Sequence, residues 1–147
     1  PSDDAGIDGG FKVGVEADWS NLVRMVPIGN EAGVNIIPGD DYGIMPIMPH
    51  VPGIYAAEFV MYSERMGIKP LDIIRWATVN VATLFGRESE LGTIAEGSMA
   101  DLIVVDGDPT TDLSLLQDPA RNLPAVMKGG KFFKNRLPTL APATAAS

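Results

Sequence analysis

The sequence has no cysteine, one histidine, no long apolar run and no run of basic residues. Without cysteine the chain forms no disulfide and no thiolate metal site, and its redox compartment stays undetermined. One histidine, His50, does not make a multi-histidine metal set. No apolar run reaches the ~20 residues that a membrane-spanning helix needs, so we expect no membrane partner. No secretory leader is visible, which makes the cytoplasm the default expectation.

The acidic charge balance excludes a further class of partner. The net charge of −8 argues against nucleic acid, because nucleic-acid binding draws on clustered lysine and arginine. Carboxylates of a metal site would add negative charge, but a solvated surface explains this value equally well. With 147 residues, 46% of them hydrophobic, the chain is long and apolar enough for a globular domain with a core.

The first third of the chain carries weak patterns. Residues 1–10 are rich in Gly, Asp and Ser and predict a loop or a disordered end. Residues 12–16 predict a short strand, and 17–20 predict a turn. A helix is expected over 21–32, kinked or delayed by its internal proline, and Gly33 should end it.

A short apolar run over 34–37 predicts a strand, and the segment 38–43 predicts the loop that follows. That loop contains the pair Asp40 and Asp41. In a parallel barrel, catalytic groups lie where strands end, which makes this pair a candidate site. Asp pairs are also common in glycine-rich turns, because their side chains bond the backbone there.

Two helices are predicted in the middle of the chain. An apolar stripe at i, i+4, i+7 and i+11 predicts the first, over 53–66, with Gly67 at its end. The stripe is formed by Tyr55, Phe59, Tyr62 and Met66. Pro70 suits the first turn of the second helix, which has few polar positions up to Gly86. We therefore expect the second helix to be buried on most sides.

The C-terminal half predicts short strands and tight turns. Residues 91–94 predict a strand, 95–98 a turn, and 102–105 a second strand. Because the run 102–105 does not alternate, we expect it to be covered on both faces. Two further strands, 125–128 and 131–134, flank a Gly-Gly pair, which predicts a hairpin.

Four polar residues alternate along the loop after the second strand, as they do in calcium-binding loops. They are Asp106, Asp108, Thr110 and Asp112. The loop has Thr111 where a calcium loop needs glycine and Gln117 where it needs glutamate. We therefore expect these side chains to cap turns rather than to bind calcium.

The stretch from Leu91 to Pro109 reads Leu-Gly-Thr-Ile-Ala-Glu-Gly-Ser-Met-Ala-Asp-Leu-Ile-Val-Val-Asp-Gly-Asp-Pro. It resembles the C-terminal signature of the amidohydrolase superfamily, the metal-dependent hydrolases related to imidazolonepropionase and dipeptide-cleaving prolidases. Residues 67–82 resemble the helix before that signature, and 125–133 resemble the final hairpin. The resemblance runs from about Asn30 to Lys134.

A complete member of this superfamily is a (β/α)8 barrel with a small β-domain, and a barrel alone takes ~250 residues. The resemblance therefore implies an α/β fold that is the C-terminal part of such a barrel plus part of the small β-domain. It implies barrel elements over 1–87, a β-domain segment over 88–136, and a disordered tail over 137–147. The chain would then be a fragment, a truncated reading frame or one piece of a split enzyme.

The resemblance also implies a site. Residues 39–43 match a Gly-x-Asp-x-Gly pattern at the end of the eighth barrel strand, which puts Asp41 in the position of a catalytic metal ligand. Many relatives have Thr where Asp40 stands, so Asp40 either adds a carboxylate or faces solvent. Tyr42 and His50 are placed as substrate-binding residues, although the family's Pro-His-Gly reads Pro-His-Val here.

The implied activity is hydrolysis of a C–N bond in an amide, a dipeptide or a cyclic amide by water activated on a divalent metal, zinc foremost. The family's other ligands, a His-x-His pair and further histidines, have no counterpart here. We therefore predict that the chain is inactive without an N-terminal part. The alternative is a non-catalytic interaction or structural module that self-associates.

Overall fold

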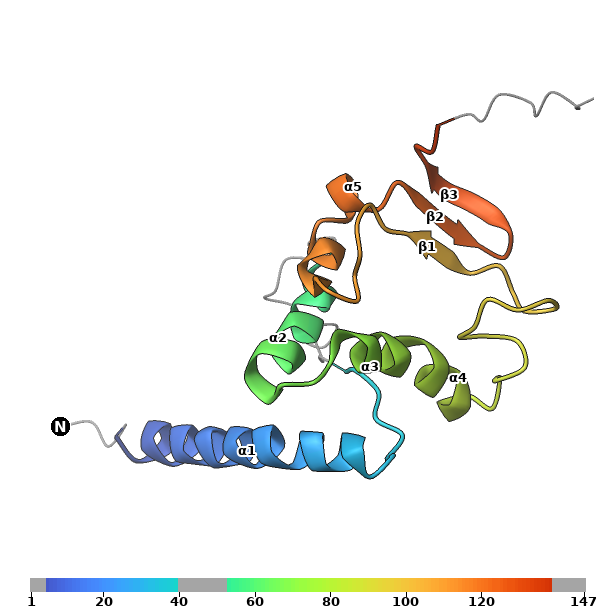
Figure 1. Ribbon diagram of the computed structural model, residues 1–147. Coiled ribbons are helices and arrows are strands. Elements are labelled where there is room, and N and C mark those ends of the chain that lie inside the picture. Colours follow the sequence, from blue (N-terminus) through green and yellow to red (C-terminus); the bar gives the residue numbers. More distant parts are fainter. Residues whose placement is uncertain (1–4, 40–52, 139–147) are drawn as a thin grey trace, which may run out of the picture.

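The computed structural model describes residues 5–39 and 53–138, with side chains from Ala17 onward. A long helix, a group of shorter helices and a small sheet follow one another from one end of the molecule to the other (Figure 1). The elements are α1 (Ala5–Glu31), η2 (Ile54–Ala56), α2 (Ala57–Met66), α3 (Pro70–Arg75), η3 (Trp76–Asn80), α4 (Val81–Leu84), β1 (Leu102–Val104), η4 (Leu113–Gln117), α5 (Pro119–Asn122), β2 (Ala125–Lys128) and β3 (Lys131–Asn135). No helix within the described ranges is long and apolar enough to span a bilayer.

Helix α1 is much longer than the sequence predicts. The loop expected over 5–10, the strand over 12–16 and the turn over 17–20 are wrong, because the helix begins at Ala5. A helix that has already formed extends more easily than a new one starts, and no proline lies between Ala5 and Pro27 to stop it. The predicted end is confirmed: Gly33 follows the helix with a φ of 75°.

The strand predicted over 34–37 is also wrong. Residues 34–37 make no strand pairing with any described residue, and the Ile36 amide instead donates a local hydrogen bond to the Val34 carbonyl oxygen at 2.9 Å. An extended segment becomes part of a sheet only when a neighbouring strand takes its backbone hydrogen bonds. Val34 is 57% exposed, so the segment lies open on one side.

The two predicted middle helices are confirmed. η2 and α2 form the first, which ends at Gly67 with a φ of 68°. α3, η3 and α4 form the second, which starts at Pro70 and is followed by Gly86 with a φ of 63°. The sequence gives no sign of η3, a π-helical turn in which the chain takes more residues per turn than in an α-helix.

The core lies between α1, α2, α3 and η4. Ile73 and Trp76 are its most buried large side chains, at 0% and 2% exposure. The cluster of buried residues is Met66, Ile68, Ile73, Trp76 and Leu113. The second helix is less covered than expected: Leu71 and Phe85 are exposed, because no described element packs on that side.

The sheet has three antiparallel strands in the order β1-β2-β3. The predicted hairpin is confirmed, and Gly129 and Gly130 turn it with φ values of 53° and 77°. The expectation that β1 is covered on both faces is wrong for this chain. Ile103 is 52% exposed and Val104 41%, and because successive side chains of a strand point to opposite faces, neither face of β1 is fully covered by the described residues.

The loop between α4 and β1 contains no strand, so the prediction for 91–94 is wrong and Ile94 is 90% exposed. The turn over 95–98 is confirmed by a hydrogen bond from the Ser98 amide to the Ala95 carbonyl. A Cβ on Gly92 would lie 2.8 Å from the Thr78 carbonyl oxygen, so this glycine lets the loop approach η3 closely.

The alternating polar residues cap turns, as predicted. The Asp108 carboxylate accepts hydrogen bonds from the Thr110 amide and hydroxyl, at 2.9 and 2.6 Å. The bond from the Thr110 hydroxyl, then that from its amide, lowers the pKa of Asp108. Asp112 accepts in the same way from Ser114 at the start of η4.

Candidate functional site

The residues that the sequence predicts for the site lie next to the described chain rather than in it. Asp41, the predicted metal ligand, and Tyr42 and His50, the predicted substrate-binding residues, lie outside the described residues. The described chain stops before them at Gly39 and resumes after them at Gly53. The structure describes the residues on either side of the segment 40–52 and the contacts that hold them.

Side chains from the second helix hold the first part of that scaffold. The Asn80 side-chain amide donates a hydrogen bond of 2.8 Å to the Ile36 carbonyl oxygen. In return, the Asn35 side-chain amide donates one of 3.2 Å to the Asn80 carbonyl oxygen. This pair of bonds fixes residues 35 and 36 against the end of η3 and gives Asn80 a structural role.

A carboxylate from α2 holds the last described residue before the predicted site. Glu58 Oε1 accepts a hydrogen bond from the Gly39 backbone amide at 3.1 Å. The Tyr62 hydroxyl, one helical turn further along α2, donates to the same oxygen. The bond from Tyr62 is partly buried and the bond from the Gly39 amide is exposed, and both are charge-assisted because the acceptor is a carboxylate.

A small cavity of about 260 Å³ opens beside this contact. It lies between the 34–39 segment, α2 and the second helix, and its described lining residues are Pro38, Gly39, Tyr55, Glu58, Phe59, Ala77 and Val81. The lining combines one carboxylate with aromatic and aliphatic side chains. The predicted site residues follow directly from this lining in the sequence.

The helices around the cavity are joined by a polar network. Asn30 on α1 accepts a hydrogen bond of 3.0 Å from the Trp76 indole and donates one of 3.3 Å to Asp72. The Tyr62 and Trp76 rings meet edge to face with centroids 5.5 Å apart. Contacts therefore run without a break from α1 through Trp76, Tyr62 and Glu58 to Gly39.

The described residues do not make a metal site. No group of three or more His, Asp or Glu side chains comes together within 17–39 and 53–138. A catalytic zinc needs about three protein ligands, so the described part of the chain does not fit this role by itself. The predicted divalent metal therefore stays a prediction that depends on Asp41 and on ligands outside the described residues.

The sequence analysis did not identify Glu58 as a residue of the site. One signal could have found it. Glu58 lies one turn before Tyr62, and this spacing lets a carboxylate and a hydroxyl meet on one helix face. Its partner, Gly39, is far away in sequence and has no side chain to mark it.

The chain belongs to the Amidohydrolase family, whose sequence pattern matches residues 20–133. The match includes part of α1, the 34–39 segment, all the central helices and the strands as far as Phe133. It confirms the resemblance that the stretch from Leu91 to Pro109 indicates.

Similar proteins include several named hydrolases. Ochratoxinase from Aspergillus niger is 35% identical over 105 residues, 71% of this chain and 20% of the relative. Imidazolonepropionase from Treponema denticola is 31% identical over 104 residues, 69% of this chain and 24% of the relative. A solved Xaa-Pro dipeptidase with methionine bound in its active site superposes with a TM-score of 0.64 at 33% identity, over 78% of this chain and 26% of that one.

The chain therefore spans about a fifth to a quarter of the length of these relatives. The structural likeness shows that the helices and the sheet are arranged as in part of an amidohydrolase-type protein. This supports the prediction that the chain is part of an amidohydrolase-type fold. The complete (β/α)8 barrel and the division of the chain at residue 87 stay predictions.

Proposed function

We propose that this chain contributes the C-terminal part of a metal-dependent hydrolase that cleaves a C–N bond in an amide, a dipeptide or a cyclic amide. The family match over residues 20–133 carries this proposal. The relatives named as an Xaa-Pro dipeptidase and an imidazolonepropionase support a C–N bond as the one that breaks. Small-molecule amides and short peptides are the proposed substrates.

Asp41 is the proposed catalytic residue and the proposed ligand of a divalent ion, with zinc as the first candidate. Such an ion, when bound, lowers the pKa of a water molecule. The Asp41 carboxylate would accept a proton from the attacking water and pass it to the leaving nitrogen. Tyr42 and His50 would line the pocket that takes the amide or peptide.

Exposed apolar side chains support a larger parent protein. Ile94 is 90% exposed, Phe133 75% and Phe85 67%. A folded protein rarely leaves several large apolar side chains open to water unless another surface covers them. We propose that further parts of the enzyme cover them and supply the remaining metal ligands.

Metal binding tests the role of Asp41. The purified chain is dialysed against Zn²⁺ or Mn²⁺, and the retained metal is measured by elemental analysis. We expect Asp41→Ala to abolish retention and Asp40→Ala, the matched control at the neighbouring carboxylate, to keep most of it. Equal retention in both variants would contradict the assignment.

Turnover tests the dependence on further parts of the enzyme. We expect no release of amino acid from Xaa-Pro dipeptides or N-acyl amino acids when the chain alone is incubated with them and Zn²⁺. Robust turnover that disappears in Asp41→Ala would show a complete site and overturn this expectation.

One observation favours a second candidate, a non-catalytic module that self-associates. Among the described residues β1 pairs only with β2, so its outer edge is open to another strand, and Ile103 on it is half exposed. A stable oligomer without bound metal, seen by analytical ultracentrifugation and elemental analysis, would favour this candidate over the hydrolase.

A further inference from the structure

We propose that Glu58 is a positioning residue, whose carboxylate fixes the backbone that leads directly into Asp40 and Asp41. The inference rests on the proposed function, in which Asp41 is the reacting carboxylate. It adds a residue on α2 that contributes through the Gly39 amide and not by touching the substrate.

The bonding pattern of Glu58 suits this role. Its Oε1 atom accepts from two donors, the Gly39 amide and the Tyr62 hydroxyl. A carboxylate oxygen with two donors is held in one orientation, and a backbone amide bonded to an anion is held more strongly than one bonded to water. The position of Gly39 is therefore tied to the position of α2.

The segment before the predicted site depends on such bonds because it has no strand partner within the described residues. Asn80 and Asn35 hold its first half, at positions 35 and 36. Glu58 makes the described side-chain bond that lies nearest to Asp41 in the sequence. Without it, the backbone between Ile36 and Asp40 would have no described anchor to α2.

The residue that orients Glu58 is itself held in the core. The Tyr62 ring meets Trp76 edge to face at 79°, and Trp76 is 2% exposed and bonded to Asn30. Tyr62 therefore cannot swing away without disturbing the most buried part of the molecule. Rigid support of this kind is what a precisely placed catalytic group requires.

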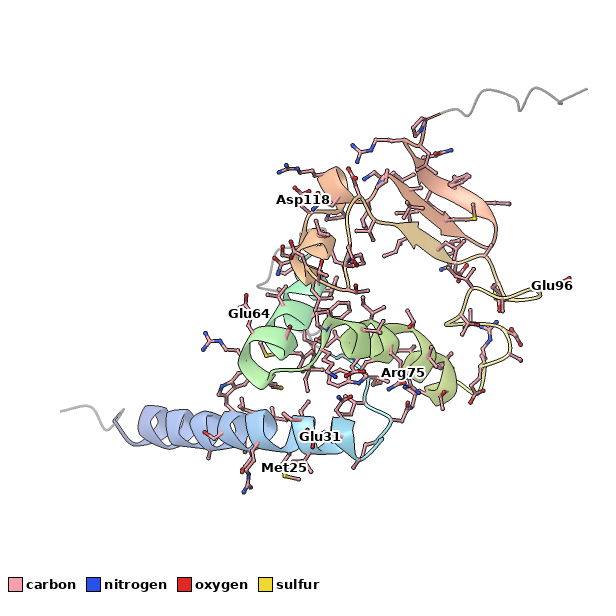
Figure 2. All side chains as sticks on the ribbon, in the orientation of Figure 1. Met25, Glu31, Glu64, Arg75, Glu96 and Asp118 are labelled. Carbon is pink, nitrogen blue, oxygen red and sulfur yellow. The ribbon has the colours of Figure 1, made fainter. Side chains whose placement is uncertain are left out.

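Amide hydrogen exchange in the full 147-residue chain, measured by NMR, tests the contact without any metal. We expect Glu58→Ala to speed exchange of the Gly39 amide by about tenfold, because one charge-assisted bond is lost. Glu58→Gln keeps an oxygen acceptor at the same place and should restore most of the protection. Glu64→Ala is the matched control, since Glu64 is an exposed glutamate on the outer side of the same helix (Figure 2).

Exchange of the Gly39 amide that is equally fast in the unchanged chain and in Glu58→Ala would overturn the proposal. So would equal acceleration in Glu58→Ala and Glu64→Ala, which would indicate general loosening of α2. Retained amide dispersion in the spectra of each variant shows that the chain is folded when the comparison is made.

Titration with Mn²⁺ tests the effect on Asp41, using paramagnetic broadening of the Gly39 amide signal. We expect Glu58→Ala to weaken Mn²⁺ binding by about tenfold, as loss of a supporting partner does at metal sites, and Glu58→Gln to bind like the unchanged chain. Equal loss in both Glu58 variants would make Glu58 a direct ligand and overturn the positioning role. Broadening unchanged in Asp41→Ala would contradict the proposed function alone, since the exchange result still decides the Glu58 contact.

Discussion

The helical part of the molecule and its sheet differ in how well they cover their own apolar residues. Among the helices, Ile73 and Trp76 are almost completely buried, at 0% and 2% exposure. On the sheet, Ile103 is 52% exposed and Phe133 75%.

This difference indicates which part is stabilised by contacts within the chain. The helices close around one core that includes residues of α1, α2, α3 and η4 (Figure 1). The sheet has a hydrogen-bonded hairpin with a register shift between Val126 and Met127, and one strand edge and much of its apolar surface are open within the described residues. The contacts that bury apolar side chains among the described residues are therefore concentrated in the helical part.

The largest expected effect is from Trp76→Ala. It should lower the free energy of unfolding by about 3–5 kcal/mol, because it leaves a cavity in the core, removes the edge-to-face contact with Tyr62 and leaves Asn30 without its indole donor. Urea denaturation followed by circular dichroism measures this loss. Trp19→Ala is the control, since Trp19 on α1 is 40% exposed. An equally large loss of stability in Trp19→Ala would show that the buried core is not what makes Trp76 important.

A smaller effect is expected where the loop between α4 and β1 meets η3. Gly92 and Gly97 have similar φ values, 83° and 86°, but only Gly92 has protein atoms close to where a Cβ would be. Gly97→Ala should cost about 1 kcal/mol for the left-handed backbone. Gly92→Ala should cost about 2 kcal/mol more, because the new methyl group would overlap the Thr78 carbonyl. Equal melting temperatures for the two variants would show that the loop does not pack on η3.

The smallest effect on stability is expected from Phe133→Ser on β3. Because Phe133 is 75% exposed, the free energy of unfolding should change by less than about 0.5 kcal/mol. Any self-association through the sheet should weaken, as measured by sedimentation, whereas Lys131→Ser on the same strand should leave it unchanged. A loss of several kcal/mol would show that the chain already covers this face.

The parts of the fold that follow local rules could be predicted from the sequence. The stripe from Tyr55 to Met66 has one helical period, and Gly67 and Gly86 adopt the left-handed backbone that ends the two helices. The Gly129–Gly130 pair fixes the hairpin by the same kind of rule. In each case a few neighbouring residues carry the whole signal.

The parts that depend on distant partners could not be predicted. The apolar runs over 34–37 and 91–94 have the composition of strands, but a strand also needs a neighbour, and none pairs with them in the described chain. Glu58 was missed for the same reason, because its bond to Gly39 joins residues that no local pattern connects. Asp41, Tyr42 and His50 stay predictions, since they lie outside the described residues.

The π-helical turn η3 has a consequence for how this sequence can change in length. An extra residue in the turn rotates everything after it by about 100° relative to a regular helix, so that Trp76 reaches Asn30 while Asn80 reaches Ile36. Deleting a single residue between Trp76 and Asn80 would let a plain α-helix form and would keep Asn80 on nearly the same face, because the deletion removes the residue that the wide turn absorbs. A deletion in this turn should therefore be tolerated more readily than one inside α2, where it would rotate every later residue of the helix by about 100°.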